Sequence, residues 1–244
     1  MVVMPDADVN KTTDALIGSA FGSAGERCMA ISVAVCVGKK TAENLKTKLL
    51  EETLKLNVGP YTDEKSDFGP LNNKAHYEKV LGYIDTGEKE GAKLLADGRN
   101  MKLQGYENGY FVGPTIFEDV KPEMKIYKEE IFGPVLSMMT ADTYEDALKL
   151  VNDHELGNGA AVFTKSGMIA KHFTENAKIG MIGVNVPIPV PVAYHSFGGW
   201  KRSLFGDHAM HGPEGIRFYT KLKTATVTWS EDNSGPEFTI PVLS

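Results

Sequence analysis

Cys28 is the residue of this sequence whose surroundings best suit a chemical role. It ends a run of glycines and small residues, Gly22-Ser23-Ala24-Gly25-Glu26-Arg27-Cys28. The glycines permit backbone angles that other residues avoid, and the small neighbours leave room for a substrate carbonyl to approach the sulfur. The adjacent Arg27 favours the thiolate form. The run by itself leaves two readings equally open, a nucleophilic cysteine and a small buried cysteine at a turn from a helix to a strand.

The other cysteine and the histidines give weaker signals. Cys36 lies in the apolar, β-branched stretch 31–37, which is typical of a packed strand residue. His208 and His211 come nearest to a metal-ligand pair, but no neighbouring cysteine completes a set, and we predict no metal site. Two cysteines also cannot make a framework of several disulfides, and we expect both to stay reduced.

Composition excludes several classes of function. The chain has 244 residues, of which 42% are hydrophobic and 24% charged, as in ordinary globular proteins. A net charge of -6, a pI of about 5.6 and the lack of a long basic run argue against a nucleic-acid partner. No apolar stretch approaches the ~20 residues that span a bilayer, and the N-terminus lacks the features of a signal peptide. We therefore expect no membrane association and a cytoplasmic protein.

Hydrophobic spacing predicts the elements that must position Cys28. A helix over 6–20 leads into the cysteine loop, a surface loop spans 57–70, and helices alternate with strands along most of the chain. This alternation predicts an α/β fold, with a largely parallel sheet covered on both faces and ligands at the carboxyl ends of its strands. The further helices are expected at 41–55, 71–90, 142–151 and 169–177, and the strands at 31–37, 93–96, 110–120, 133–139, 160–164 and 181–186.

Two segments near the C-terminus do not fit a central sheet. In the stretch 187–192 every second residue is a proline, which has no backbone N–H. A strand there would lack half of its hydrogen-bond donors, so we predict an extended connection. The stretch 223–229 has the composition of a strand but lies far along the chain from the others. It is expected either to pair with another subunit or to form an internal edge strand, and the sequence leaves both open.

Three segments together resemble the aldehyde dehydrogenase superfamily, in their order and separation as well as in their residues. They are Gly25-Glu26-Arg27-Cys28, Glu129-Glu130-Ile131-Phe132-Gly133-Pro134 and Ser196-Phe197-Gly198-Gly199-Trp200-Lys201. The stretches 183–191, 205–207 and 215–220 further resemble its CoA-acylating, methylmalonate-semialdehyde branch. The resemblance implies a three-layer catalytic domain over 1–222, followed by an oligomerisation strand and tail over 223–244.

The resemblance also implies roles for four residues. Cys28 matches the nucleophile, Glu130 the glutamate that accepts hydrogen bonds from the nicotinamide ribose of NAD, and Phe132 the aromatic ring beside that ribose. Without the family, Glu129 and Glu130 read as a solvated acidic pair. Arg27 is a candidate clamp for a substrate carboxylate, and its alternative role is a salt bridge with Glu26 or Asp14.

The implied reaction oxidises a small semialdehyde with NAD and coenzyme A. Cys28 attacks the aldehyde carbon to form a thiohemiacetal, its backbone N–H helps to stabilise the oxyanion, and hydride transfer to NAD leaves a thioester. The acyl group then passes to coenzyme A, and the β-carboxylate leaves as carbon dioxide or bicarbonate to give propionyl-CoA or acetyl-CoA. The resemblance further implies a homo-oligomer, a tetramer.

The family's dinucleotide-binding half precedes the cysteine region, and this sequence begins inside the family pattern. We therefore expect a catalytic fragment without the N-terminal dinucleotide-binding domain, inactive by itself. Two alternatives stay open, another aldehyde dehydrogenase that releases a free acid and a non-catalytic oligomerisation fragment. A cysteine hydrolase is disfavoured because none of the six histidines carries a recognisable partner motif for Cys28.

Overall fold

The computed structural model describes residues 1–229, which build a seven-stranded sheet in the order β3-β4-β5-β2-β1-β7-β8. All neighbours in this sheet are parallel except β3 and β4, and the short strands β6 and β9 pair separately as an antiparallel ribbon. The strands are β1 Val2–Val3, β2 Val33–Val37, β3 Lys93–Ala96, β4 Thr115–Glu118, β5 Val135–Ala141, β6 Leu156–Gly157, β7 Gly159–Phe163, β8 Met181–Val184 and β9 Trp200–Lys201.

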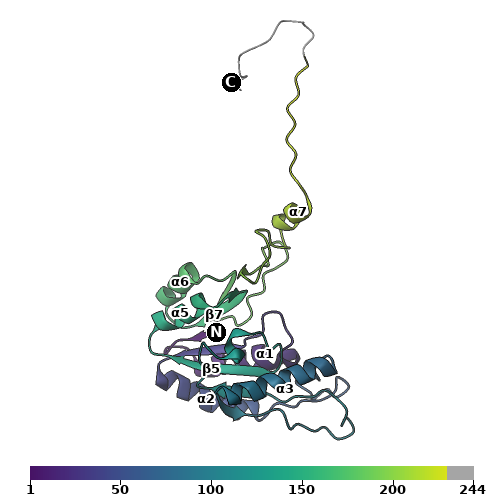
Figure 1. The fold of residues 1–244 in the computed structure, drawn as a ribbon. Helices are drawn as coiled ribbons and strands as arrows, with labels where there is room; N and C mark the ends of the chain where they lie inside the picture. Colours follow the sequence, from purple (N-terminus) through teal and green to yellow (C-terminus); the bar gives the residue numbers. More distant parts are fainter. Residues whose placement is uncertain (230–244) are drawn as a thin grey trace.

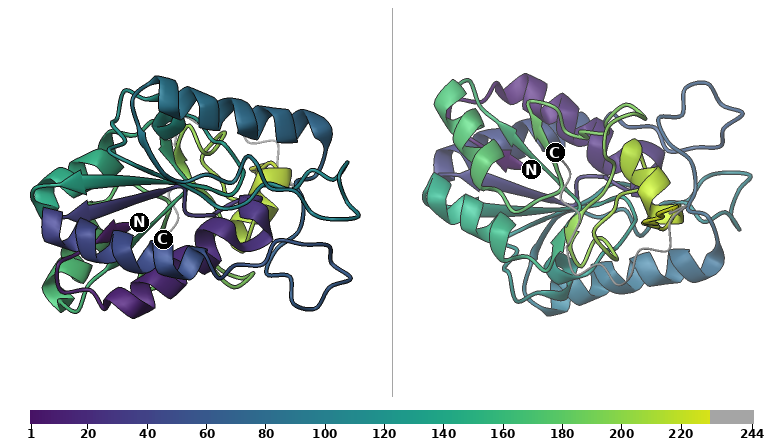
Figure 2. Two further views of the ribbon diagram at one scale, coloured as in Figure 1. Left: turned by 90° about the horizontal axis from the view of Figure 1, so that it is seen from below. Right: turned by 90° about the horizontal axis from the view of Figure 1, so that it is seen from above.

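Helices cover both faces of the sheet and make the three-layer α/β arrangement that the sequence predicts. Figure 2 shows α1 and α2 side by side on one face and α3 on the opposite face. Side chains of the residues that precede them cap four helices, because their oxygens accept otherwise unpaired N–H groups of the first turn. The helices are α1 Val9–Phe21, α2 Lys39–Thr53, α3 Lys74–Lys89, α4 Lys125–Lys128, α5 Tyr144–Asp153, α6 Gly167–Asn176 and α7 Pro213–Tyr219, and a 3₁₀ turn, η1, spans Gly22–Gly25.

The core lies around β2 and β5, the central pair of the sheet. Five residues of each strand are in register, from Val33 opposite Ser137 to Val37 opposite Ala141. Strand β2 reads as a continuous apolar run because helices bury it on both sides, as expected for a parallel strand. Leu45 and Leu49 of α2 are almost fully buried against this core. This central pair matters for the site because β2 and β5 each follow a loop that carries predicted site residues.

Two features of the sheet differ from the sequence prediction. The strand predicted at 110–120 is limited to β4, because the peptide groups before it bond to loops: Leu71 N–H donates to the Tyr110 carbonyl at 2.9 Å, and Gly113 N–H to the Gly98 carbonyl at 3.0 Å. Pro114 also has no N–H to offer a neighbouring strand. Strand β1 was not predicted, because two residues are too short to show a periodicity.

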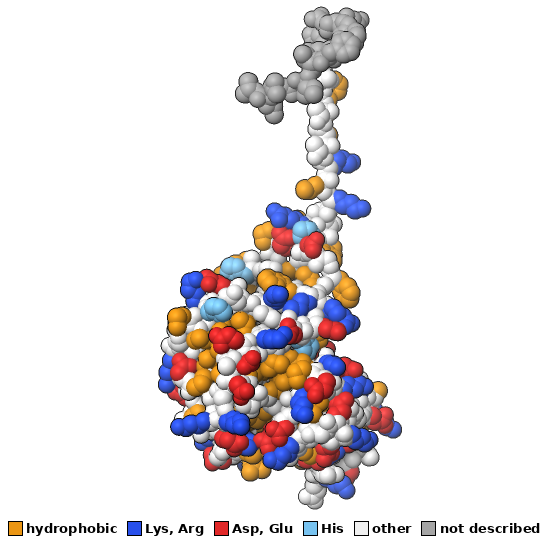
Figure 3. Space-filling view, turned by 60° about the vertical axis from the view of Figure 1, so that its left-hand side comes forward, with side chains coloured by type: hydrophobic (Ala, Val, Ile, Leu, Met, Phe, Trp, Pro, Cys, Tyr) orange, Lys and Arg blue, Asp and Glu red, His pale blue; other side chains and the backbone are white. Residues whose placement is uncertain are grey.

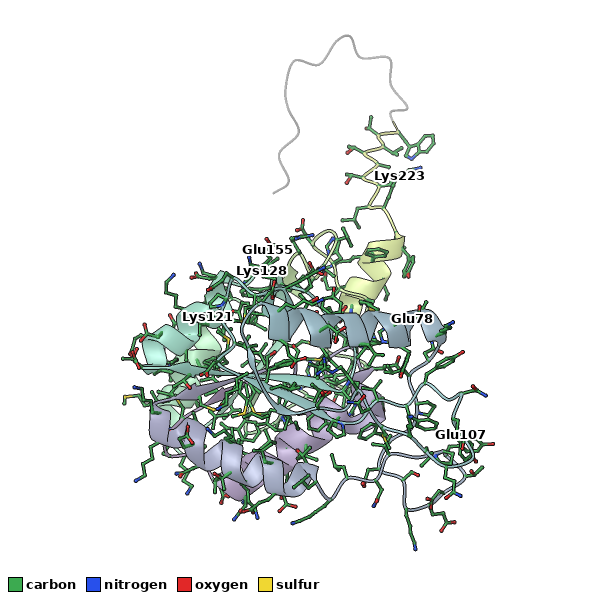
Figure 4. All side chains as sticks on the ribbon, turned by 60° about the horizontal axis from the view of Figure 1, so that its bottom comes forward. Glu78, Glu107, Lys121, Lys128, Glu155 and Lys223 are labelled. Atoms are coloured by element: carbon green, nitrogen blue, oxygen red, sulfur yellow. The ribbon has the colours of Figure 1, made fainter. Side chains whose placement is uncertain are left out.

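The C-terminal part leaves the body of the molecule as an extended arm beyond α7 (Figure 1), and Lys223 lies on this arm (Figure 4). The proline-rich stretch 187–192 forms no strand, as predicted. The internal edge strand considered for 223–229 is wrong, since these residues pair with no strand of the described chain. The tail predicted beyond them, 230–244, lies outside the described residues. Over residues 1–229, no helix is both long and apolar enough to cross a membrane.

Candidate active site

A pocket of about 540 Å³ lies at the amino ends of the parallel strands, not at their carboxyl ends as predicted. The loops that enter β2, β5 and β7, on the amino side of the strands, provide most of its polar groups, and others come from α4 and from Ser203. Figure 3 shows one face of the body on which hydrophobic side chains gather at the centre and charged ones surround them. The residues of the pocket wall that matter below are Cys28, Glu129, Glu130, Phe132, His154 and Asn158.

Cys28 is exposed in the turn that follows η1, and it lines the pocket. Ser23, Ala24 and Gly25 all have left-handed backbones, with φ of 54°, 55° and 73°. Gly25 is required there, because a Cβ would lie 2.1 Å from the carbonyl oxygen of Gly133. The Ala30 N–H then donates to the Arg27 carbonyl at 3.1 Å and closes the turn around Cys28. The structure thus presents the thiol and does not support the buried-cysteine alternative.

Asn158 fixes the backbone of Cys28 and was missed by sequence reasoning. Its side-chain Nδ2 donates to the Cys28 carbonyl at 2.9 Å from the loop that leads into β7. Among residues 1–229 the N–H of Cys28 donates no hydrogen bond to protein. The only sequence signal was a polar residue between two glycines, Gly157-Asn158-Gly159, which does not point to Cys28 without the fold.

The loop from Glu129 to Phe132 forms another wall of the pocket, between α4 and β5. Glu130 is exposed, while Phe132 is half-buried with a left-handed φ of 59°. Glu129 is set apart from Glu130 because it accepts a hydrogen bond from the hydroxyl of Tyr83. Burial, together with that carboxylate, raises the pKa of Tyr83 to about 12. Both members of the acidic pair are thus exposed and line the pocket, but only Glu129 is anchored by a side-chain hydrogen bond.

Helix α3 holds this loop from behind. Lys79 Nζ donates to the Glu130 carbonyl at 3.2 Å, and His76 Nε2 lies 2.6 Å from the Phe132 carbonyl oxygen. Val80 fills the space beside Gly133, where a Cβ would lie 2.7 Å from it. Contacts with α3 thus support the Glu129–Phe132 loop, which belongs to no helix or strand.

Arg27 is exposed next to Cys28, and its Nη1 donates to the Gly18 carbonyl at 3.3 Å, near the end of α1. The predicted salt bridge with Glu26 or Asp14 is not formed within the described residues. Glu26 instead accepts from the Asn72 N–H and lies beside His76. The contact with Gly18 holds the arginine through a neutral partner, and within residues 1–229 no carboxylate pairs with its charge; Arg27 adjoins Cys28 in sequence but is not itself among the pocket-lining residues.

Lys201, from the third motif segment, has a bracing role. Its ammonium donates to the carbonyls of Val151, Asn152 and His154, at 3.3, 3.0 and 2.9 Å, and so satisfies the end of α5. Burial lowers the pKa of Lys201. Val151 and His154 line the pocket, so the lysine supports the wall that faces Cys28.

Comparison with known proteins agrees with this geometry. The aldehyde dehydrogenase family profile matches residues 1–225. A malonate-semialdehyde dehydrogenase of Pseudomonas aeruginosa is 52% identical over 99% of this chain and 49% of its own length. The solved methylmalonate-semialdehyde dehydrogenase of Oceanimonas doudoroffii is 52% identical, with a TM-score of 0.90 over 95% of this chain and 47% of its own.

A Sinorhizobium meliloti protein described as a methylmalonate-semialdehyde dehydrogenase, solved with NAD, is 55% identical. Its TM-score is 0.91 over 96% of this chain and 48% of its own. The chain thus spans about half the length of the relatives that it matches. The family match covers the cysteine loop, the Glu129–Phe132 loop and the segment that contains Lys201. The chain belongs to the aldehyde dehydrogenase family.

Proposed function

We propose that this chain is the catalytic half of an NAD-dependent, CoA-acylating dehydrogenase of malonate or methylmalonate semialdehyde. The observation that carries the proposal is that an exposed cysteine and the Glu130–Phe132 loop line one pocket of about 540 Å³. The names of the relatives, malonate-semialdehyde and methylmalonate-semialdehyde dehydrogenases, support the substrate class.

The pocket wall suits a nicotinamide ribose. Glu130 offers an exposed carboxylate, which can accept hydrogen bonds from ribose hydroxyls, and the half-buried Phe132 offers an aromatic surface on the same wall. Bound NAD supplies a hydride acceptor there. The binding of NAD to the Sinorhizobium meliloti relative supports this use of the loop.

Cys28 performs the covalent steps. Its thiolate adds to the aldehyde carbon, and the new C–S bond leaves an oxyanion that the Cys28 N–H is free to stabilise. Loss of hydride from that carbon gives a thioester on Cys28. The β-carboxylate leaves as carbon dioxide, or with water as bicarbonate; the electron pair of the broken C–C bond passes into the thioester enolate, and the α-carbon takes up a proton from solvent. The thiol of coenzyme A loses its proton and displaces the enzyme sulfur, which leaves as the thiolate.

Arg27 is proposed to hold the substrate carboxylate. Its guanidinium is exposed beside the proposed nucleophile, and the one hydrogen bond that it makes within residues 1–229 is to a neutral carbonyl. A carboxylate that is only one carbon away from the aldehyde must bind close to Cys28, where a bidentate contact fixes both oxygens. Replacement of Arg27 by lysine keeps the charge but not the fork, and we expect KM for the semialdehyde to rise about tenfold.

The test is the cofactor dependence of the full-length protein with malonate and methylmalonate semialdehyde. We expect NADH and an acyl-CoA in equal amounts, with little turnover when coenzyme A is omitted. Free acid formed at the same rate without coenzyme A would identify instead a hydrolytic aldehyde dehydrogenase. No NADH with either semialdehyde would refute the proposed function.

We also propose that the arm carries a homo-oligomer contact. Leu222, Val227 and Trp229 are largely exposed on the extended segment, which pairs with no strand among residues 1–229. A strand with an unpaired edge and apolar side chains is suited to pair with a sheet of another subunit. Replacement of Trp229 by aspartate should lower the molar mass measured by light scattering, whereas Tyr61→Asp, on an exposed loop of the body, should not.

A further inference from the structure

Both loops of the site are held in a conformation that their sequence does not favour. Ser23 and Ala24 in the cysteine loop and Phe132 in the facing loop are non-glycine residues with left-handed φ. Such residues persist only where the surrounding structure determines their conformation strongly. The contacts that join the two loops are therefore the place to look for residues that position the site.

One direct contact between the loops is made by backbone alone. Gly25 packs on the Gly133 carbonyl so closely that no side chain fits between them. This contact sets how near the two loops approach each other, but it contains no hydrogen bond that would fix their register. We therefore look for such a bond among the side chains.

Glu26 and His76 provide that link. The Glu26 Oε1 accepts from the Asn72 N–H at 3.2 Å and lies 3.3 Å from His76 Nε2. The same Nε2 lies 2.6 Å from the Phe132 carbonyl oxygen. Both neighbours of Nε2 are acceptors, so this nitrogen carries the hydrogen, which bonds to the Phe132 carbonyl of one loop while the Glu26 carboxylate of the other loop lies 3.3 Å away. The N-cap Asn73 holds the His76 N–H at 2.9 Å and anchors the link at the start of α3.

The link is largely shielded from water, as is the Lys46–Glu118 pair, whose side chains are 20% and 14% exposed, and unlike most pairs on the surface. The side chains of His76 and Glu26 are 16% and 19% exposed, whereas those of Lys171 and Glu175 are 72% and 57% exposed. Hydrogen bonds with so little solvent access hold geometry better than exposed ion pairs do. The Phe132 ring also packs edge-on against the His76 ring, with centroids 6.3 Å apart.

We propose that Glu26 and His76 are positioning residues that hold the Cys28 loop in register with the Phe132 loop. Neither side chain is among the residues that line the pocket, so each acts through the loop that it holds. The inference rests on the proposed function in so far as Cys28 is taken as the nucleophile and Phe132 as a cofactor contact.

The kinetic test uses His76→Phe, His76→Gln, Glu26→Ala and Glu26→Gln in the full-length protein. Phenylalanine keeps a ring but removes the donor, whereas glutamine supplies an N–H near the position of Nε2. We expect His76→Phe to lower kcat about tenfold and to raise KM for NAD, Glu26→Ala to lower mainly kcat, and both glutamine variants to recover most of the loss. The double variant His76→Phe/Glu26→Ala should be no worse than the worse single variant.

His172→Phe is the matched control, because His172 joins α6 to α5 through the Tyr144 hydroxyl at 2.9 Å and does not line the pocket. It should leave kcat and KM for NAD within about twofold of wild type. Losses that multiply in the double variant, or that equal those of the control, contradict the proposal.

Hydrogen exchange tests the link independently of catalysis. The reporters are the Glu26 and Ala30 amides, bonded to Ser23 and Arg27, and the Val135 amide, bonded to Gly133. We expect Glu26→Ala to speed exchange at Val135 at least threefold and His76→Phe to do so at Glu26 and Ala30, with no change in His172→Phe. Unchanged exchange in the opposite loop overturns the link even if the enzyme is active. A wild type without turnover defeats only the proposed function, since the exchange result still decides the link.

Discussion

Cys28 and Cys36 are the same side chain in two opposite settings within one short stretch of the chain. Cys28 stands in an exposed turn that follows three left-handed residues, 23–25, and that Asn158 contacts from another loop. Cys36 is fully buried inside β2, opposite Thr140 of β5 and Val3 of β1. The boundary between a loop and a buried strand thus separates an exposed thiol, which we propose to be the nucleophile, from one that only packs.

We propose that placement before the strand, and not inside it, makes the difference in reactivity. Burial raises the pKa of the Cys36 thiol to about 12, so it stays neutral and unreactive at physiological pH. Cys28, in contrast, is exposed to solvent and lines the pocket. The β2–β5 core buries Cys36 and also supports the loop in which Cys28 is exposed.

The sharpest way to break this comparison is to remove each thiol in turn. Cys28→Ala should lower turnover at least ~10⁴-fold, because no other group replaces the covalent nucleophile. Cys36→Ala should keep kcat within about twofold and lose only ~1 kcal/mol of unfolding free energy from the small cavity. Steady-state NADH formation and urea unfolding measure the two effects. Comparable activity of the two variants would refute the distinction.

Alkylation kinetics sharpen the contrast in reactivity. At about pH 8 a thiol with a pKa near 12 is ionised to only ~10⁻⁴, so iodoacetamide should modify Cys28 and leave Cys36 untouched until urea unfolds the chain. Peptide mass spectrometry reads both sites. Modification of Cys36 in the folded protein at a rate near that of Cys28 would contradict its burial.

Stability at high pH follows from the same burial. The pKa of Cys36 is raised from 9.0 in the unfolded chain to about 12, so its contribution to stability is complete below about pH 9. That contribution declines as pH rises toward 12, because the unfolded chain ionises first. The Tm of wild type should therefore fall more steeply than that of Cys36→Ala between about pH 9 and 11. Parallel curves for the two proteins would exclude this origin of the alkaline loss.

Gly25→Ala tests whether the strained loop depends on its contact with Gly133. The new Cβ would lie 2.1 Å from the Gly133 carbonyl at a left-handed φ of 73°, and we expect a loss of about 3 kcal/mol, or roughly 6–12 °C in Tm. The matched control is Gly82→Ala on the exposed side of α3, where no atom lies within 4 Å and alanine should stabilise by up to ~1 kcal/mol. Equal Tm values for both variants would show that the loop is not confined.

Asn158→Ala gives the smallest expected effect. It removes one hydrogen bond to the Cys28 carbonyl, which is worth about 0.5–1.5 kcal/mol, so kcat should fall up to about tenfold and alkylation of Cys36 should not change. Asn152→Ala is the control, because Asn152 also bonds to backbone groups, those of Asn176 and Lys178, away from Cys28. An equal loss of kcat in both variants would assign the effect to general destabilisation.

Much of the fold could be predicted from the sequence because most of its strands are buried apolar runs between amphipathic helices. The strand at 93–96 is confirmed residue for residue, and those at 31–37 and 160–164 to within two residues. The errors have local causes. Peptide groups at 110–114 bond to loops, and 223–229 has strand composition but no strand partner in the described part of the chain.

The site was only half predictable. Cys28, Glu130 and Phe132 were predicted from their motifs, and all three line one pocket. Asn158 and His76 were missed because each acts through a backbone carbonyl of a distant loop, a contact that leaves no sequence pattern. The pocket lies at the amino ends of the strands because most of its polar residues stand in the loops that enter β2, β5 and β7, and residue types alone do not show at which end of a strand a loop closes.

The central claim, that Cys28 is the acyl-carrying thiol, is tested most directly by mass spectrometry of the full-length protein after reaction with methylmalonate semialdehyde and NAD in the absence of coenzyme A. We predict a single acyl adduct that maps to the peptide containing Cys28, disappears on addition of coenzyme A and is absent from Cys28→Ala. The same adduct on Cys28→Ala, or an adduct that maps to another residue in the wild type, would contradict the account.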